Sequence, residues 1–232
     1  FSQVTTLPPH HPDRRALQRA GELAEREIVR LSQHSYCAGL WEADTFGRYQ
    51  YLEGLRRGFD RLAAPSSVND GAKWIARITD TNFPKAQQII DWSHGTERLW
   101  AVGNAVFGDV TPEAAQWVKQ RKTELWAGRV AAVGTALQAL NLDQDKYPEI
   151  VRQAPGYFQE RMAEMRYADF RDAGYPIGSG TVESAARNVV QPRMRRPGRG
   201  WAREKAEAML TALAEFHSGR LHSTWQRVYA AG

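Results

Sequence analysis

Three acidic residues stand where the chain leaves regular structure, and their type suits divalent-metal chemistry: Asp70, Asp91 and Glu183. Carboxylates that converge from separate elements are the ligands that hard cations such as Mg²⁺ or Mn²⁺ prefer. Two such ions can activate a water or a 3′-hydroxyl and stabilise the leaving oxygen of a phosphodiester. The spacing of these three acids matches no specific sequence signature, so purely structural roles stay open. Asp70-Gly71 is a common turn pair, and a first-turn glutamate often only caps its helix.

A second candidate motif is Asp91-x-x-His94, which follows a short apolar run ending at Ile90. An aspartate and a histidine near the end of a strand can share a metal ion. The alternative is structural, with Asp91 capping a helix and His94 packed and hydrogen-bonded within the fold. The sequence leaves both interpretations open.

Glu183 belongs to a stretch that combines a glycine turn, a short helix and a basic loop. Pro176, Gly178 and Gly180 interrupt the preceding structure, and apolar residues from Val182 onwards recur at helical spacing. The helix dipole stabilises a carboxylate in the first turn of such a helix. Cationic side chains in and after the helix suit the phosphates of a nucleic acid: Arg187, Arg193, Arg195, Arg196, Arg199 and Lys205. The plainer alternative is a solvated basic surface.

The composition indicates a globular protein that suits an anionic partner. The 232 residues carry a net charge of +5, with 42% hydrophobic and 25% charged residues. The single cysteine, Cys37, excludes a disulfide framework or a cysteine-rich zinc site within the chain and fits an intracellular compartment. The sequence contains no signal peptide and no apolar run of transmembrane length, so we expect no membrane partner.

Residues 1–94 predict the first part of an α/β core. The patterns predict strands over residues 1–6, 65–71 and 86–90, and helices over residues 13–31 and 42–62 and from about residue 72. Asp70 and Asp91 then each stand at the carboxyl end of a strand, where open sheets bind their ligands.

Residues 95–174 predict an all-helical insertion, and residues 175–232 predict a C-terminal part with the Glu183 helix, the basic loop and a closing helix. Within the insertion the apolar periodicity predicts helices over residues 97–107, 111–140 and 147–167, the last with a break near Pro155. The closing helix is predicted over residues 201–217. The expected fold is therefore α/β but predominantly helical.

Several motifs occur together in a fixed order. The longest reads Tyr175-Pro-Ile-Gly-Ser-Gly-Thr-Val-Glu-Ser, with Val189-Val-Gln-x-Arg and Gly200-Trp201 after it. The motifs upstream are Ser35-Tyr36, Phe46-Gly47, Leu55-Arg-Arg-Gly58, Asp70-Gly-Ala-x-Trp-Ile, Phe83-Pro and Ile90-Asp-Trp-x-His. In these motifs the sequence resembles the bacterial insertion-sequence transposases of the ISKra type, and the resemblance covers residues 35–225.

The resemblance implies an incomplete ribonuclease-H-like core interrupted by a helical insertion, as in the larger group of Mutator-like transposases. That group uses an Asp-Asp-Glu triad and an Asp/Cys-x-x-His motif. Asp70 matches the second aspartate of the triad, Glu183 matches its glutamate, and Asp91 and His94 match the accessory motif. No residue of this sequence matches the first aspartate, so we expect either that an N-terminal part is lacking or that a descendant has lost this residue. Pro65 and two serines also replace the apolar run that usually precedes the second aspartate.

The sequence thus predicts a transposase catalytic domain that cleaves DNA at insertion-sequence ends and joins them to target DNA. The implied metal ligands are Asp70 and Glu183, whose carboxylates should lie within about 6–8 Å of each other. Two Mg²⁺ or Mn²⁺ ions are expected only in the complete enzyme. The implied partner is DNA at the nucleoid in the bacterial cytoplasm, and a homodimer is left open. The alternative function is that of a catalytically inactive, transposase-derived DNA-binding protein.

Overall fold

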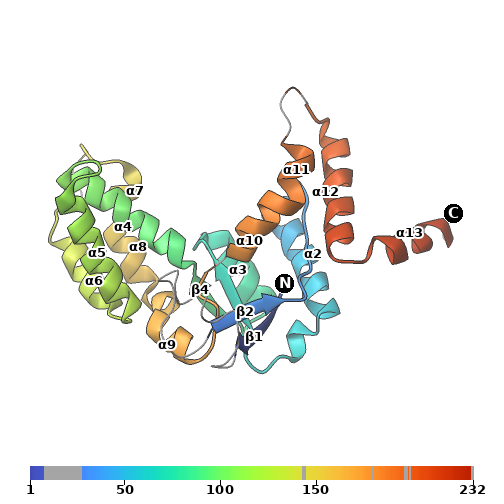
Figure 1. Cartoon of the computed structure of the whole chain (residues 1–232), viewed down its shortest axis with the longest axis horizontal. Helices are drawn as coiled ribbons and strands as arrows, with labels where there is room; N and C mark the ends of the chain where they lie inside the picture. Colours follow the sequence, from blue (N-terminus) through green and yellow to red (C-terminus); the bar gives the residue numbers. More distant parts are fainter. Residues whose placement is uncertain (8–27, 143–144, 179, 196–197, 199, 231–232) are drawn as a thin grey trace. The chain divides into compact units, whose positions relative to one another are not determined.

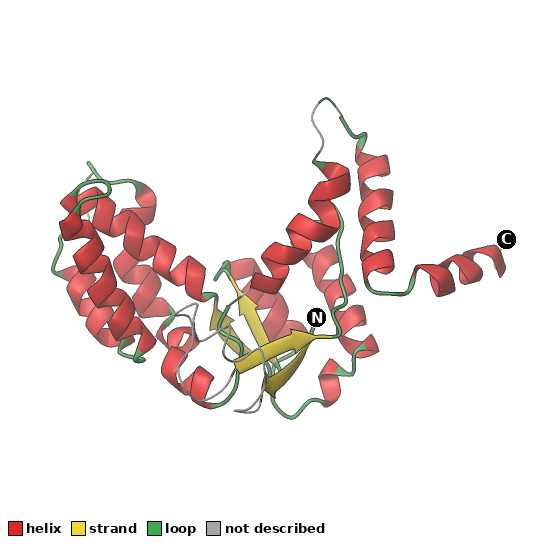
Figure 2. Ribbon diagram, in the orientation of Figure 1, coloured by secondary structure: helices red, strands yellow, loops and turns green. Residues whose placement is uncertain are grey.

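The computed structural model describes the chain except residues 8–27, 143–144, 179, 196–197, 199 and 231–232. The described residues are predominantly helical and contain two small two-stranded sheets, which confirms a helix-rich α/β class (Figures 1 and 2). Two compact units are present. The terminal unit comprises Phe1–Pro65, Lys73–Ala86 and Ser179–Gly232, and the central unit comprises Ser66–Ala72 and Gln87–Gly178. No helix within the described ranges is both long and apolar enough to cross a membrane.

The central unit contains a parallel strand pair. Strand β3 (Ser66–Asn69) runs alongside β4 (Gln87–Ile90), with Asn69 opposite Ile90 at the carboxyl end. Both strands lie within their predicted ranges. The serines of β3 do not prevent the strand, and Pro65 stands just before it, a position at which a proline needs no ladder hydrogen bond. The apolar residues of β4 are fully buried, which anchors the pair in the core of the unit.

The rest of the central unit is a set of packed helices, which occupies the green to amber part of Figure 1. In chain order they are α4 (Trp92–Phe107), α5 (Pro112–Trp126), α6 (Val130–Gln138), α7 (Glu149–Arg152), α8 (Ala154–Glu160), the 3₁₀ turn η2 (Met162–Met165) and α9 (Tyr167–Asp172). Helices α4 and α5 pack against each other, as do α6 and α8. Leu99, Phe158 and Tyr167 are among the fully buried side chains, so a single core joins these helices to β4.

The helices predicted in this unit have wrong boundaries. Helix α4 begins at Trp92 instead of Glu97, because the Asp91 carboxylate caps it. The predicted helix over residues 111–140 starts as expected, since Thr111 accepts a hydrogen bond from the Ala114 amide, but it splits into α5 and α6. Gly128 adopts a φ of 74°, a left-handed conformation that ends α5.

The predicted helix over residues 147–167 is also divided. It splits into α7, α8 and η2, and the breaks fall at Gln153 and Arg161. Pro155 does not break the helix at its own position, because it stands in the first turn of α8, where the missing N–H costs nothing.

The terminal unit contains an antiparallel strand pair. Strand β1 (Gln3–Leu7) was predicted, and it pairs with β2 (Ile28–Ser32), with Leu7 opposite Ile28. The helix predicted over residues 13–31 is wrong at its end, since residues 28–31 form β2. Ile28 and Val29 are β-branched and favour a strand once β1 offers a partner. The rest of that predicted helix lies outside the described residues.

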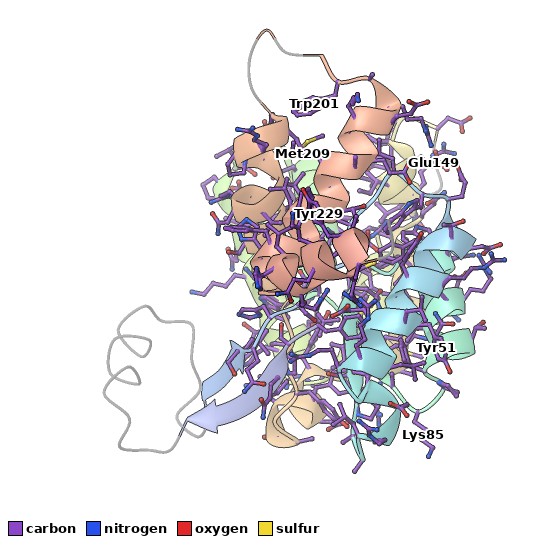
Figure 3. The ribbon with its side chains drawn as sticks, turned by 90° about the vertical axis from the view of Figure 1, so that its right-hand side faces the viewer. Tyr51, Lys85, Glu149, Trp201, Met209 and Tyr229 are labelled. Atoms are coloured by element: carbon purple, nitrogen blue, oxygen red, sulfur yellow. The ribbon has the colours of Figure 1, made fainter. Side chains whose placement is uncertain are left out.

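The other regular elements among the described residues of the terminal unit are helices. They are α2 (Ala43–Arg56), the 3₁₀ turn η1 (Phe59–Arg61), α3 (Lys73–Asn82), α10 (Gly180–Ala185), the π-helical turn η3 (Ala186–Val190), α11 (Gln191–Met194), α12 (Arg203–His217) and α13 (Leu221–Ala230). The predicted closing helix corresponds to α12, which carries Met209, and α13, which carries Tyr229, was not predicted (both residues are labelled in Figure 3). Side chains join distant elements: Trp41 donates to Glu207 over 2.6 Å, and Arg220 donates to Glu53 over 2.9 Å.

Candidate active site

The candidate site is built at the carboxyl edge of the β3–β4 pair. Asp70 directly follows the last residue of β3, and Asp91 directly follows the last residue of β4. The strands are parallel and Asn69 lies opposite Ile90, so both aspartates leave the same edge. The Asp91 amide donates to the Asn69 carbonyl over 2.7 Å, which continues the ladder up to the site. The prediction that each aspartate ends a strand is confirmed.

Asp70 forms a turn and keeps an exposed carboxylate. Its Oδ1 accepts a hydrogen bond from the Ala72 amide over 2.9 Å, and the Asn69 Oδ1 accepts from the Gly71 amide over the same distance. These two bonds fix the backbone between β3 and α3. The turn-forming role that the sequence left open is therefore present. It does not consume the side chain, because the aspartate remains exposed to solvent.

Three residues that the sequence did not indicate surround this turn. Arg161 donates from Nε and Nη2 to the Gly71 carbonyl over 3.3 and 3.1 Å, and the Tyr157 hydroxyl donates to the Asp70 carbonyl over 3.4 Å. The Arg98 and Arg161 guanidinium carbons lie 3.8 and 4.6 Å from the centre of the Tyr157 ring. Two cations are thus held on one aromatic ring beside the Asp70 turn.

The electrostatics of this cluster favour a bound anion. Burial raises the pKa of the Tyr157 hydroxyl, and the charges of Arg98 and Arg161 oppose this without cancelling it, so the phenol stays a neutral donor. The Arg98 Nη1 is buried and has no hydrogen-bond partner among the described residues. A buried N–H without an acceptor is costly, and the two guanidinium charges on the Tyr157 ring favour an anion at the surface of this cluster.

Asp91 serves the structure of the site. Its side chain is fully buried, and its Oδ1 accepts from the His94 amide over 3.1 Å, which caps α4. His94 Nδ1 lies 3.3 Å from the same oxygen, and the histidine side chain is 40% exposed. The accessory motif therefore forms a capped helix start in which Asp91 orients a partly exposed imidazole. The capping alternative is confirmed for Asp91, while a catalytic role for either residue stays a prediction.

Neighbouring groups fix the strand end that carries Asp91. The Tyr167 hydroxyl donates to the Ile90 carbonyl over 3.1 Å inside the core, and burial raises the pKa of this phenol. The Trp92 amide donates to the Ile177 carbonyl over 2.9 Å. A Cβ built on Gly178 would lie 3.9 Å from the Asp91 Oδ2. The segment that leads towards Glu183 is thus held beside Asp91 as far as Gly178, five residues before Glu183 in the chain.

Glu183 belongs to the terminal unit. It is exposed in the first turn of α10, as predicted, and Arg187 is exposed in the π-helical turn that follows. Its approach to Asp70 of the central unit stays a prediction. Within the described ranges, no group of three or more His, Cys, Asp or Glu side chains is arranged to hold a metal ion.

The predicted basic loop begins later than expected. Arg193 lies in α11 and not in a loop, because Pro192 takes the first-turn position in which proline is compatible with a helix. Arg193, Arg195 and, on α12, Lys205 are exposed. Arg196 and Arg199 lie outside the described residues. These exposed cations are available for phosphates.

Gly71 gives a direct test of this packing. Its φ is 82°, and an added Cβ would lie 2.8 Å from the Ile90 Cδ1 and 2.9 Å from the Tyr157 hydroxyl. We expect Gly71→Ala to lower the free energy of unfolding by more than about 1 kcal/mol. The matched control is Gly134→Ala in α6, where a Cβ meets nothing within 4 Å; it should be neutral or raise stability by up to about 1 kcal/mol. Urea titration of both variants measures this, and equal stabilities would contradict the packing around Gly71.

No protein-family model, curated protein or solved structure matches this chain.

Proposed function

We propose that this chain is the catalytic part of a Mutator-like DNA transposase with a ribonuclease-H-like core. The observation that carries the proposal is the carboxyl edge of β3 and β4. An exposed Asp70 and a buried Asp91 leave adjacent parallel strands there, Arg161 donates to the Asp70 turn, and Arg98 stacks on the Tyr157 ring that contacts the same turn. Open α/β sheets bind ligands at this edge, and an acid beside two arginines suits a phosphodiester.

The donor types fit a divalent metal. Asp70 and Glu183 are exposed carboxylates and would hold it, since hard cations prefer carboxylate oxygen. When bound, such ions activate a water or 3′-hydroxyl and stabilise charge on the leaving oxygen. Asp91 is buried and occupied by the α4 cap, so it acts as a positioning residue that fixes the strand end and orients His94.

The cations that we assign to phosphates of the cleaved DNA fall into two groups by their environment. Arg161 contacts the Asp70 turn and Arg98 stacks on the same Tyr157 ring, and their charges suit the phosphate that is cleaved. Arg187, Arg193, Arg195 and Lys205 are exposed in the terminal unit and suit phosphates along the DNA backbone. Contacts of the second kind position the duplex without reading its sequence.

Metal binding by Asp70 tests the proposal directly. Titration of the full chain with Mn²⁺, followed by electron paramagnetic resonance, should show binding that Asp70→Asn weakens at least about tenfold, the loss typical of removing even an outer-shell group. Asparagine keeps the oxygen that accepts from the Ala72 amide, so the turn should survive. The control, Asp109→Asn, removes another exposed carboxylate of the central unit and should change nothing.

Two outcomes of that titration would overturn the proposal. Equal Mn²⁺ affinity in Asp70→Asn and Asp109→Asn would exclude Asp70 as a ligand. A wild-type chain that binds duplex DNA but no Mn²⁺ would support the alternative function, a catalytically inactive DNA-binding protein.

The exposed arginines make a separate prediction. Each phosphate contact contributes about −0.9 to the slope of log affinity against log salt for duplex DNA. Arg193→Ala with Arg195→Ala should therefore flatten the slope by about 1.8 and weaken all sequences alike. The control pair, Arg129→Ala with Arg152→Ala, removes the same charge from exposed positions of the central unit. Fluorescence anisotropy at several salt concentrations measures both slopes, and an unchanged slope in the first pair would leave these arginines as solvated surface.

A further inference from the structure

A separate feature of the central unit is a cavity of about 340 Å³ on helices α4 and α5. This tryptophan pocket is lined mainly by Trp92, Trp100, Trp126, Lys119, Lys122 and Thr123. Its volume lies at the lower end of the range for small-ligand sites, which suits a ligand of one or two rings. Three indole rings line the cavity, and Trp100 remains 39% exposed.

Two of the three indoles of the pocket, Trp92 and Trp126, are held by neighbouring side chains. The Trp92 ring meets Trp126 edge to face at a centroid distance of 5.1 Å, and it meets the buried Tyr167 in the same way at 5.0 Å. The Arg171 guanidinium carbon lies 3.8 Å from the centre of the Trp126 ring, and its Nη2 donates to the Trp126 carbonyl over 2.8 Å. A ligand that contacts these two indoles therefore orders little side-chain freedom there.

The charge of the pocket is positive. Lys119, Lys122 and Trp126 follow one another at three- and four-residue spacing, so they share one face of α5. None of the residues that line the pocket is acidic. In the part of the chain that the structure describes, neither lysine forms an ion pair, and both ammonium groups are available to an anion.

We propose that the tryptophan pocket binds an unpaired nucleotide of single-stranded DNA. Its base would stack on the exposed indole of Trp100 and its neighbours, and the flanking phosphates would lie on Lys119 and Lys122. A nucleotide joins a flat aromatic face to a negative charge within a few bonds, which is the combination that the pocket offers. Every base has such a face, so binding is expected to depend little on sequence. This site goes beyond the proposed cleavage site, because none of the carboxylates assigned to the metal lines it.

The experiment is an anisotropy titration of the full chain against a fluorescein-labelled thymidine hexamer. It is run in EDTA, so a failure of the metal site cannot influence it. Trp100→Ala should weaken binding at least about fivefold, the loss of one stacked base. The matched control is Trp74→Ala on α3, which removes an indole of similar exposure, 42% against 39%. A thermal melt of each variant checks that it remains folded.

The lysines provide a second variant that does not depend on the first. Lys119→Gln with Lys122→Gln should flatten the salt slope for the hexamer by about 1.4, since each contact to a single strand contributes about 0.7. The control pair, Lys85→Gln with Lys146→Gln, removes two exposed lysines elsewhere and should leave the slope unchanged.

Three results would overturn the inference. The first is equal affinity in Trp100→Ala and Trp74→Ala. The second is equal binding of an abasic hexamer, which would show a phosphate surface without a base site. The third is a duplex of the same length that binds as tightly as the single strand and loses the same affinity in Trp100→Ala. In that case the pocket contacts paired DNA and no extruded base.

Discussion

Replacement of Glu183 by glutamine is expected to slow metal-dependent DNA cleavage about a thousandfold while duplex affinity stays within about twofold. A carboxylate that helps to hold a catalytic metal supports several kcal/mol of transition-state stabilisation. Each 1.36 kcal/mol corresponds to a factor of ten in rate, so about 4 kcal/mol gives this loss. Glu183 is exposed in the first turn of α10, so glutamine should not disturb packing. The measurement is single-turnover nicking, with Mn²⁺, of a plasmid that carries the DNA flanking the gene.

The control is Glu204→Gln, which neutralises another exposed acid in the first turn of a terminal-unit helix, α12. It should cleave as the wild type does. Equal cleavage by both variants would remove Glu183 from the site. A wild-type chain that binds this DNA without cleaving it would favour the inactive DNA-binding alternative.

The strand ends of the candidate site could be predicted because their signals are local. A short strand-like run followed by Asp70-Gly71 predicts a strand and a turn, and the turn hydrogen bonds lie within three residues of one another. The run before Asp91 likewise ends at a buried Ile90. Local sequence placed both aspartates correctly, although it could not tell that only one of them is exposed.

The cationic cluster could not be predicted, because it depends on tertiary packing. Arg161 reaches the Gly71 carbonyl across 90 residues of sequence, and Tyr157 reaches the Asp70 carbonyl across 87. No spacing rule connects such positions. For Asp91, capping was one of two interpretations that the local sequence allowed, and the hydrogen bond from the His94 amide decides in favour of the cap. Its full burial by distant segments could not be predicted.

The wrong helix boundaries have simpler causes. Gly128 lies inside a continuous helical pattern, and a glycine there either stays in the helix or ends it in a left-handed conformation. The apolar residues up to Leu31 have helical spacing, but residues 28–32 pair with β1 and form a strand. Gly219, with a φ of 71°, ends α12 and lets α13 start as a separate helix. In each case either a left-handed glycine or pairing with a neighbouring strand overrides the apolar periodicity of a helix.

The second large effect concerns the core that positions the strand ends. Phe158 on α8 is fully buried in the central unit with Ile90, Leu99 and Tyr167. We expect Phe158→Ala to lower the free energy of unfolding by about 3–5 kcal/mol, through lost burial and the cavity left behind. Because whole domains are stable by only about 5–15 kcal/mol, this is a large fraction. Urea unfolding followed by tryptophan fluorescence measures it, since Trp92 packs on Tyr167 within the same core.

The matched control for this variant is Phe216→Ala on α12, which makes the same substitution at a side chain that is 60% exposed. Phe216→Ala should change the free energy of unfolding by no more than about 0.5 kcal/mol, because substitutions at exposed positions rarely change it more. The two variants remove the same atoms, so the difference between them reports burial alone. If Phe158→Ala cost as little as Phe216→Ala, α8 would not belong to the core that holds β4. The site could not then be positioned by the packing described here, because β4, Asp91 and the Tyr157 that contacts the Asp70 turn all depend on that core.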